Sequence, residues 1–230
     1  MDWKVILFCL MGGIVSADTD AAWQSMISQP LVACTVAGWL LGNIGLGWTV
    51  GALMQLPYLA EFPVGGAKVS VGNLGSYVAS GVAIQLNELF AQNINLILMT
   101  AILFGVILSY FTHPCISWLR HLNLMLLRRA ERAAENGKLY EITKLNYIGV
   151  LNTYLFGVVY VALFFLVGSF VLEEVLNRVP LQIETYLHFF KPMLLGAGVG
   201  AMFWIFVKRK TAKHTFLGVV LSAIIIFLSS

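Results

Sequence analysis

The chain has 230 residues, of which 59% are apolar and only 11% are charged, with a formal net charge of +3; its mean hydropathy is +0.85. Soluble domains carry about 25% charged residues, and a soluble core of this size cannot hide so much apolar surface from water. The composition therefore excludes a soluble globular protein and predicts an all-α, polytopic integral membrane protein.

Apolar stretches along the chain predict about six or seven membrane spans, some of them broken or re-entrant. They lie near residues 5–17, 31–60, 69–86, 94–116, 146–172, 193–207 and 215–228. At a rise of 1.5 Å per residue, 94–116 and 146–172 are long enough to cross a bilayer. The short first stretch could pass for a signal peptide, but further spans follow it and we expect a retained helix. No linker divides the chain, so we expect one membrane domain over residues 1–230.

The second stretch, residues 31–60, carries no charge but is interrupted by five glycines, Asn43 and Pro57. Irregular backbone at membrane depth persists only where it is buried in protein or lines a wet cavity. The break at residues 42–47 therefore predicts a transport site. The next stretch, 69–86, is too polar to face lipid, and its glycines allow close helix contact, so we expect it inside the protein.

Ten of the fourteen Lys and Arg residues fall within residues 118–144 and 208–213. Short loops rich in Lys and Arg stay in the cytoplasm, which places both segments inside and the acidic segment 173–184 outside. Asp18 and Asp20 then lie outside if residues 31–116 cross an odd number of times, whereas a re-entrant hairpin would reverse this. Nucleic acid is not expected as a partner, because each basic segment is flanked by apolar spans.

Residues 118–136 predict an amphipathic helix that ends before Gly137. Leucines and alanines form one stripe, and most of the arginines lie elsewhere. Such a helix can lie on an anionic inner leaflet, dock a cytosolic partner, or simply be a surface helix with solvated charges. We therefore regard residues 118–144 as a basic amphipathic segment on the cytoplasmic side.

Motifs for catalysis or metal binding are missing from the sequence. It contains no phosphate-binding loop, nucleophile elbow, zinc-protease or dinucleotide-binding pattern. The three cysteines are widely separated, and no histidine is placed with a carboxylate partner. We predict a protein without catalytic residues, metal or cofactor of its own.

Polar residues gather around the broken span instead. The predicted substrate-binding residues are Gln55, Glu61, Lys68, Asn73 and Asn43. An ionisable group at membrane depth costs roughly 2.5 to 3.5 kcal/mol, so Glu61 and Lys68 are expected to face a cavity or each other. Alternatively, Glu61 and Lys68 are only interfacial residues at the two ends of a short turn outside the membrane. Such groups suit a neutral polar ligand such as a sugar, and an ion site would use the same ones.

Three blocks of this sequence resemble a known family. They are QPLVACTVAGWLLG at residues 29–42, GALMQLPYLA with the following VGG at residues 51–66, and RAERAAENGK at residues 129–138. Together they resemble the IIC membrane component of the mannose/fructose/sorbose class of the bacterial sugar phosphotransferase system (PTS). The chain departs from the family pattern at Gln55 and Asn43, where acidic residues are usual.

The resemblance implies a multi-pass permease subunit in the bacterial cytoplasmic (inner) membrane, acting in an oligomer. It implies that the chain works with a IID membrane subunit to bind and move a hexose-type sugar. Soluble IIA and IIB proteins would carry the phosphoryl group, and IIB would phosphorylate the sugar. Two alternatives remain open: an ion-coupled secondary carrier in which Glu61 titrates, and a transport-deficient regulatory subunit that recruits a IIB-like protein through residues 118–138.

Overall fold

The computed structural model describes residues 2–58, 72–180 and 182–206, and all regular structure within these ranges is helical. The elements in chain order are α1 (Trp3–Asp20), α2 (Pro30–Leu41), α3 (Ile44–Tyr58), α4 (Gly72–Leu89), α5 (Ile94–Glu135), α6 (Leu139–Arg178), α7 (Gln182–Tyr186), the 3-10 turn η1 (Leu187–Phe189) and α8 (Phe190–Phe206). The predicted all-α class is confirmed. The span predicted at 215–228 and the basic segment 208–213 lie outside the described residues.

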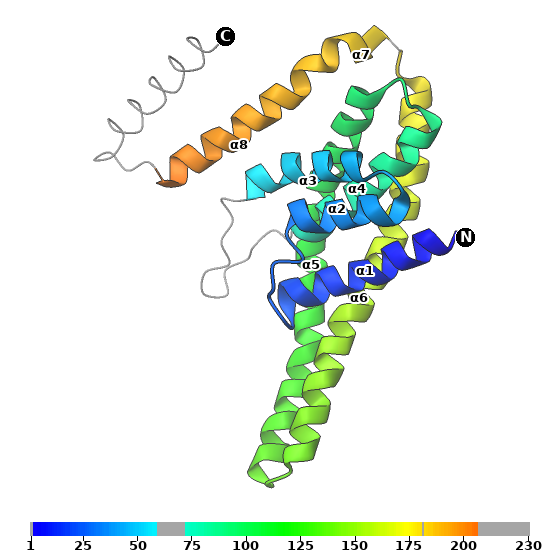
Figure 1. Ribbon diagram of the computed structural model, residues 1–230. Coiled ribbons are helices and arrows are strands. Elements are labelled where there is room, and N and C mark those ends of the chain that lie inside the picture. The colour runs from blue at the N-terminus through cyan, green and yellow to red at the C-terminus, as the bar shows by residue number, and fades with distance from the viewer. Residues whose placement is uncertain (1, 59–71, 181, 207–230) are drawn as a thin grey trace.

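Two helices of the described part are long and apolar enough to cross a membrane. They are α5, with 42 residues, and α6, with 40 residues, and their most apolar windows have mean hydropathies of 2.2 and 2.6. The two run antiparallel as a hairpin whose far end projects well beyond the remaining helices (Figure 1). Gly137 turns the chain at the tip of this hairpin with a φ of +67°, a left-handed conformation that glycine adopts without strain.

The basic segment does not form a helix of its own. Residues 118–135 continue α5 without interruption, although Pro114 lies inside the helix. This extension of α5 is supported by α6, which packs along it and buries Leu119 and Ala133. Asn152 of α6 also donates a 3.1 Å hydrogen bond from Nδ2 to Oδ1 of Asn123. The segment is therefore part of one helical arm of a projecting hairpin.

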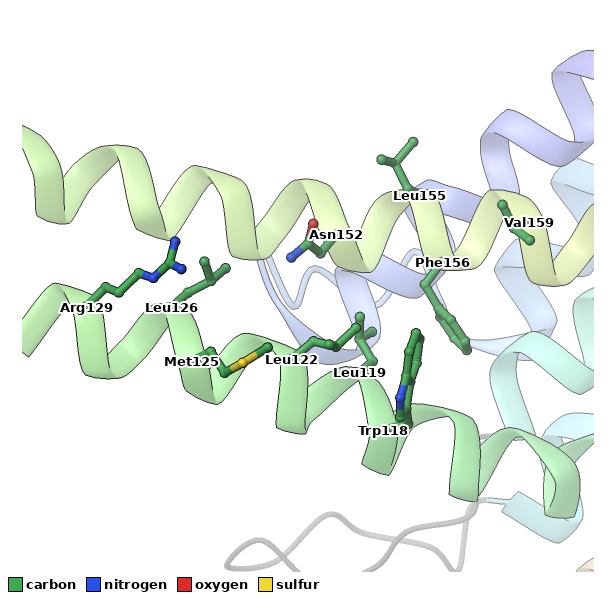
Figure 2. A pocket seen from close by; sticks show the side chains of 10 residues that line it. All are labelled: Trp118, Leu119, Leu122, Met125, Leu126, Arg129, Asn152, Leu155, Phe156 and Val159. Atoms are coloured by element: carbon green, nitrogen blue, oxygen red, sulfur yellow. The ribbon is translucent and has the colours of Figure 1, made fainter.

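The projecting part of the hairpin carries an apolar groove. The groove has a volume of about 480 Å³ and includes Trp118 and Met125 from α5 with Leu155 and Val159 from α6. Figure 2 shows Trp118 of α5 and Phe156 of α6 between the two helices, with Arg129 towards the tip. Trp118 is 63% exposed, so a large apolar surface is left uncovered by the described part of the chain.

The interrupted stretch forms a tight helical hairpin of α2 and α3. Gly42 ends α2 with a φ of +95°, and Asn43 starts α3 by accepting a 3.0 Å hydrogen bond from the Leu46 N–H at Oδ1. A Cβ on Gly38 would lie 2.6 Å from the Asn43 carbonyl oxygen, so this close approach requires glycine. The 12 residues of α2 span about 18 Å, too short for a hydrocarbon layer of about 30 Å. The hairpin therefore has the dimensions of a re-entrant element.

The core is centred on α4, as its glycines and polar residues predict. Every residue from 74 to 84 is buried. Tyr77 stacks on Phe8 of α1 with 4.5 Å between ring centroids and donates a 2.9 Å hydrogen bond to the Phe8 carbonyl. A Cβ on Gly81 would meet the same Phe8 ring, so the glycine allows α1 to approach α4.

Asp18 and Asp20 lie on the side of the basic segment, which is the alternative that the sequence predicts for a re-entrant hairpin. Asp20 Oδ1 lies 3.4 Å from Nη2 of Arg120, which places the end of α1 beside the start of that segment. The α2–α3 hairpin returns the chain to the side from which it started, so among the described residues between 20 and 120 only α4 and α5 pass through the body. At the other end of α5, Glu184 accepts a 2.9 Å hydrogen bond from the Asn95 N–H. The acidic and basic segments thus lie at opposite ends of α5.

Candidate functional site

Four helix ends meet on one side of the body, at the left in Figure 1: the C-terminal ends of α1 and α3 and the N-terminal ends of α2 and α4. Neutral polar side chains gather here in an otherwise apolar protein. We call them the hairpin-base cluster: Thr19, Gln29, Gln55, Tyr58, Asn73 and Ser109. The first five are half-buried, and Ser109 is buried.

Gln55 holds the two arms of the α2–α3 hairpin together. Its Nε2 donates a 3.0 Å hydrogen bond to Oε1 of Gln29, and its Oε1 accepts a 3.2 Å bond from the Leu31 N–H. The first N–H groups of a helix have no partner within the helix, and Gln29 does not cap α2 with its side chain. The Gln55 side-chain oxygen therefore caps the first turn of α2, while its Nε2 holds the Gln29 side chain.

Asn73 joins the start of α4 to the end of α1. Its Nδ2 donates a 3.2 Å hydrogen bond to Oγ1 of Thr19, and that hydroxyl donates a 2.8 Å bond to the Val15 carbonyl. The Thr19 hydroxyl is thereby held in a fixed orientation. Two of the predicted binding residues, Gln55 and Asn73, are thus placed at the same end of the body.

Tyr58 completes the cluster from the end of α3. Its hydroxyl donates a 2.8 Å hydrogen bond to Oγ of Ser109 on α5, which in turn donates a 2.8 Å bond to the Gly105 carbonyl. A Cβ on Gly72 would lie 2.6 Å from the Tyr58 ring, so the glycine makes room for this aromatic side chain. The ring links three helices at the base of the hairpin.

The loop between α1 and α2 is organised by Asp18. The carboxylate accepts 2.7 Å bonds from both the N–H and the hydroxyl of Ser25, and a 2.9 Å bond from the Ser28 N–H. Burial alone would raise the pKa of Asp18, but the hydrogen bonds from Ser25 and Ser28 outweigh it and hold the pKa below its ordinary value. This loop ends at Gln29 and so positions that side chain against Gln55.

The remaining predicted residues are placed elsewhere. Asn43 is at the opposite end of the hairpin, about 18 Å along α2 from Gln29, where it caps α3. Glu61 and Lys68 lie outside the described residues, in the segment that joins Tyr58 to Gly72. Sequence reasoning missed Gln29 and Tyr58 as site residues, although both lie inside the blocks that resemble the family. It also missed Thr19 and Ser109, which carry no sequence signal because their role depends on contacts between distant helices.

The cluster has the chemistry of a hydrogen-bonding site for a neutral ligand. Its amides and hydroxyls both donate and accept, and no charged side chain belongs to it among the residues described. The described part of the chain also has no group of three or more His, Cys, Asp or Glu side chains arranged to hold a metal ion. The arrangement fits binding of a polyhydroxylated molecule.

Comparison with known proteins identifies the family. Residues 3–228 match the family model described as the PTS system sorbose-specific IIC component. A solved structure described as "Structure of membrane protein" aligns with a TM-score of 0.73 and 21% identity, covering 97% of this chain and 87% of that one; at this identity the likeness shows a shared fold. No curated protein matches. The family match spans nearly the whole chain, and the chain therefore belongs to the sorbose-specific IIC components of the mannose class, the membrane subunits of PTS sugar permeases that act together with other PTS components.

Proposed function

We propose that this chain binds a hexose-type sugar at the hairpin-base cluster and moves it across the bacterial cytoplasmic membrane, where a IIB subunit phosphorylates it. One observation carries this proposal: neutral polar side chains from α1, α2, α3 and α4 converge beside a short helical hairpin. Carriers typically place their substrate at such interrupted helices near the middle of the membrane. The family description, which names sorbose, supports a sugar of this class.

Sugar binding would exchange hydrogen bonds within the cluster for bonds to the ligand. A typical intramolecular hydrogen bond contributes a net 0.5 to 1.5 kcal/mol, roughly what a sugar hydroxyl can return. Gln55 and Asn73 would contact the sugar directly, and Asn43 would hold the hairpin turn. Glu61 and Lys68, on the segment joining α3 to α4, would complete the site. Because Gln55 joins the two arms of the α2–α3 hairpin, the replacement of its hydrogen bonds by bonds to the sugar would also change the contact between α2 and α3.

The orientation follows from the charges. We place the tip of the α5–α6 hairpin, with the basic residues 118–144, in the cytoplasm, where its arginines would meet IIB. The whole of residues 1–230 would form one multi-pass membrane domain. A IID membrane subunit would pack on the α6 side of the apolar groove, at Leu155 and Val159, because these apolar side chains are exposed and lie within the predicted span 146–172. IIA would supply phosphoryl groups to IIB, and the subunits would form an oligomer.

The site assignment is tested by uptake of radiolabelled L-sorbose and D-mannose in cells that also express IIA, IIB and IID. Gln55→Ala and Asn73→Ala are each expected to reduce uptake by at least about tenfold, equivalent to roughly 1.4 kcal/mol. Gln92→Ala is the matched control, because Gln92 is exposed in the turn before α5. Immunoblotting of membranes checks insertion. Wild-type uptake in both site variants would remove the assignment.

The state of the accumulated sugar tests the mechanism. Phosphoryl transfer by IIB predicts that the sugar inside the cell is phosphorylated and that a protonophore leaves the initial rate unchanged. Free sugar whose accumulation collapses with the protonophore would identify an ion-coupled carrier instead.

A further inference from the structure

A cavity lies where the end of α1 meets the α5–α6 hairpin. Most of its lining residues are apolar, among them Ile116, Leu126 and Val150, and a small number of polar groups converge in it. It has a volume of about 620 Å³, and its lining includes Asp20, Arg120, Asn123, Tyr147 and Thr153. Small-molecule sites usually have volumes of about 300 to 1,000 Å³, and their mostly apolar lining includes a small number of polar groups that point into the site. α1 packs across α6 at this level (Figure 1).

The charged pair in this cavity is incompletely satisfied. Asp20 is 13% exposed and Arg120 is 62% exposed, and their contact of 3.4 Å is long for a charge-assisted hydrogen bond. The second carboxylate oxygen of Asp20, Oδ2, is buried without a hydrogen-bond partner among the described residues. A buried acceptor left in this way is costly. A ligand hydroxyl that donates to Asp20 as the exposed Arg120 side chain moves aside would relieve that cost.

The α5–α6 side of the cavity adds neutral groups that are held by hydrogen bonds. Asn123 donates a 3.4 Å bond to the Gly149 carbonyl while it accepts from Asn152, and Thr153 donates a 3.1 Å bond to the same carbonyl. Tyr147 lines the cavity with a ring that is 70% exposed. The cavity thus offers a carboxylate, a guanidinium, an amide and an aromatic face together.

These groups select a neutral ligand rich in hydroxyls. A cation drawn to Asp20 is repelled by Arg120, and an anion drawn to Arg120 is repelled by Asp20. An apolar ligand would leave the buried polar atoms without partners. A sugar donates to the carboxylate and accepts from the guanidinium, and its C–H face can pack on an aromatic ring.

The cavity adjoins the hairpin-base cluster through consecutive residues of α1. Thr19 bonds to Asn73 on α4, and Asp20 bonds to Arg120 on α5. Neighbouring residues on a helix point about 100° apart, so the two sites lie on different sides of the same last turn. We propose that the cavity lined by Asp20 and Arg120 is a second sugar site, which receives the substrate on the cytoplasmic side of the hairpin-base cluster. The identity of the sugar and the cytoplasmic position rest on the proposed function.

Protection from chemical labelling tests this second site directly. Asn146 lines the cavity and is exposed, so Asn146→Cys places a reporter thiol there; Cys115→Ser removes the one native thiol that is not buried. The full chain, purified in detergent, is labelled with a maleimide in the presence of L-sorbose, D-mannose or sodium chloride. At least one sugar is expected to slow labelling threefold or more, and sodium chloride is expected to have no effect.

Variants decide whether the protection comes from this cavity. Asp20→Asn and Arg120→Gln are each expected to abolish protection, whereas Gln55→Ala keeps it because the second site binds independently. Glu131→Gln, at an exposed position of the same hairpin, is the control for loss of a charge and keeps protection. Size-exclusion chromatography checks folding, and Arg120→Gln stands alone if Asp20→Asn does not fold, since Arg120 is largely exposed.

The outcomes separate this proposal from the proposed function. If cells with the native chain take up sugar but no sugar protects the thiol, the second site is ruled out while the transport role stands. Protection that persists in Arg120→Gln, or protection by sodium chloride alone, also overturns it. Protection combined with undiminished uptake by both Gln55→Ala and Asn73→Ala would instead reject the first site and leave the second.

Discussion

Asp18 shows how one buried carboxylate organises a functional loop. It is 2% exposed and accepts three hydrogen bonds from Ser25 and Ser28. The loop contains Trp23, Gln24 and Met26 at positive φ, a conformation that non-glycine residues adopt at a cost. The Asp18 hydrogen bonds offset this strain, so the position of Gln29 depends on a residue outside the cluster.

Asp18→Ala is expected to destabilise the protein by about 2 to 4 kcal/mol, because it removes hydrogen bonds to a charged acceptor and leaves two backbone donors without their partner. The pKa of Asp18 is lower in the folded than in the unfolded protein. The carboxylate therefore stabilises the fold at every pH above the unfolded value of about 3.9. This contribution is lost as the pH falls through the lower pKa of the folded state. The measurement is the Tm in detergent at pH 7. Glu88→Ala, at an exposed site, is the control, and an equal Tm for both variants would contradict this role.

The α2–α3 hairpin depends on glycines that face the partner helix. A Cβ on Gly47 would collide with the Cys34 carbonyl, whereas a Cβ on Gly45 would have its nearest neighbour, Asn43 Oδ1, at 3.9 Å. Two glycines only two residues apart therefore have different roles. Gly47 sets the distance between the helices, and Gly45 lies in open space.

Gly47→Val is expected to push α2 and α3 apart, lowering stability by about 1 to 3 kcal/mol and disturbing the Gln29–Gln55 contact. Gly45→Ala is the matched control and should preserve both stability and uptake, because alanine also favours a helix over glycine. Thermal unfolding in detergent and sugar uptake in cells measure the two effects. Equal behaviour of the two variants would show that hairpin packing is not limiting.

At the scale of the whole molecule, the ends of α5 define two poles. Asp20 and Arg120 lie at one level, and Glu184 lies with Asn95 at the other end. The pole with Asp20 also holds the hairpin-base cluster and the second cavity, and the hairpin tip projects beyond it. This arrangement puts both proposed sugar sites towards the side on which phosphorylation would occur.

Labelling of intact cells with a membrane-impermeant maleimide tests this polarity. In a Cys115→Ser background, Thr185→Cys is expected to react from outside, whereas Ala21→Cys and Glu135→Cys should react only after the cells are opened. All three positions are exposed. Reaction of Ala21→Cys together with Thr185→Cys would mean that the Asp20–Arg120 pair does not reflect the native topology.

The sequence by itself determined the features that depend on local composition and periodicity. These are the all-α membrane class, the two long spans, the enclosed stretch 74–84, the break after Leu41 and the opposite placement of the acidic and basic segments. Local pattern also carried the family resemblance. It did not distinguish a polar residue that caps a helix, such as Asn43, from one that faces a shared site, such as Gln55, because both stand out equally from apolar neighbours.

Only the tertiary structure decided which helix ends meet. The contacts of Asn73 with Thr19 and of Asp20 with Arg120 join residues 54 and 100 positions apart, and no local pattern encodes them. The continuity of α5 also depends on tertiary contacts. Its packing against α6 keeps the helix intact past Pro114 and along the basic segment. The short α2–α3 hairpin decided between the two topologies that the sequence left open, because it turns the chain back where a full span would have crossed. The location of both sites therefore follows from how the helices pack, while the residue types that suit a sugar were already present in the sequence.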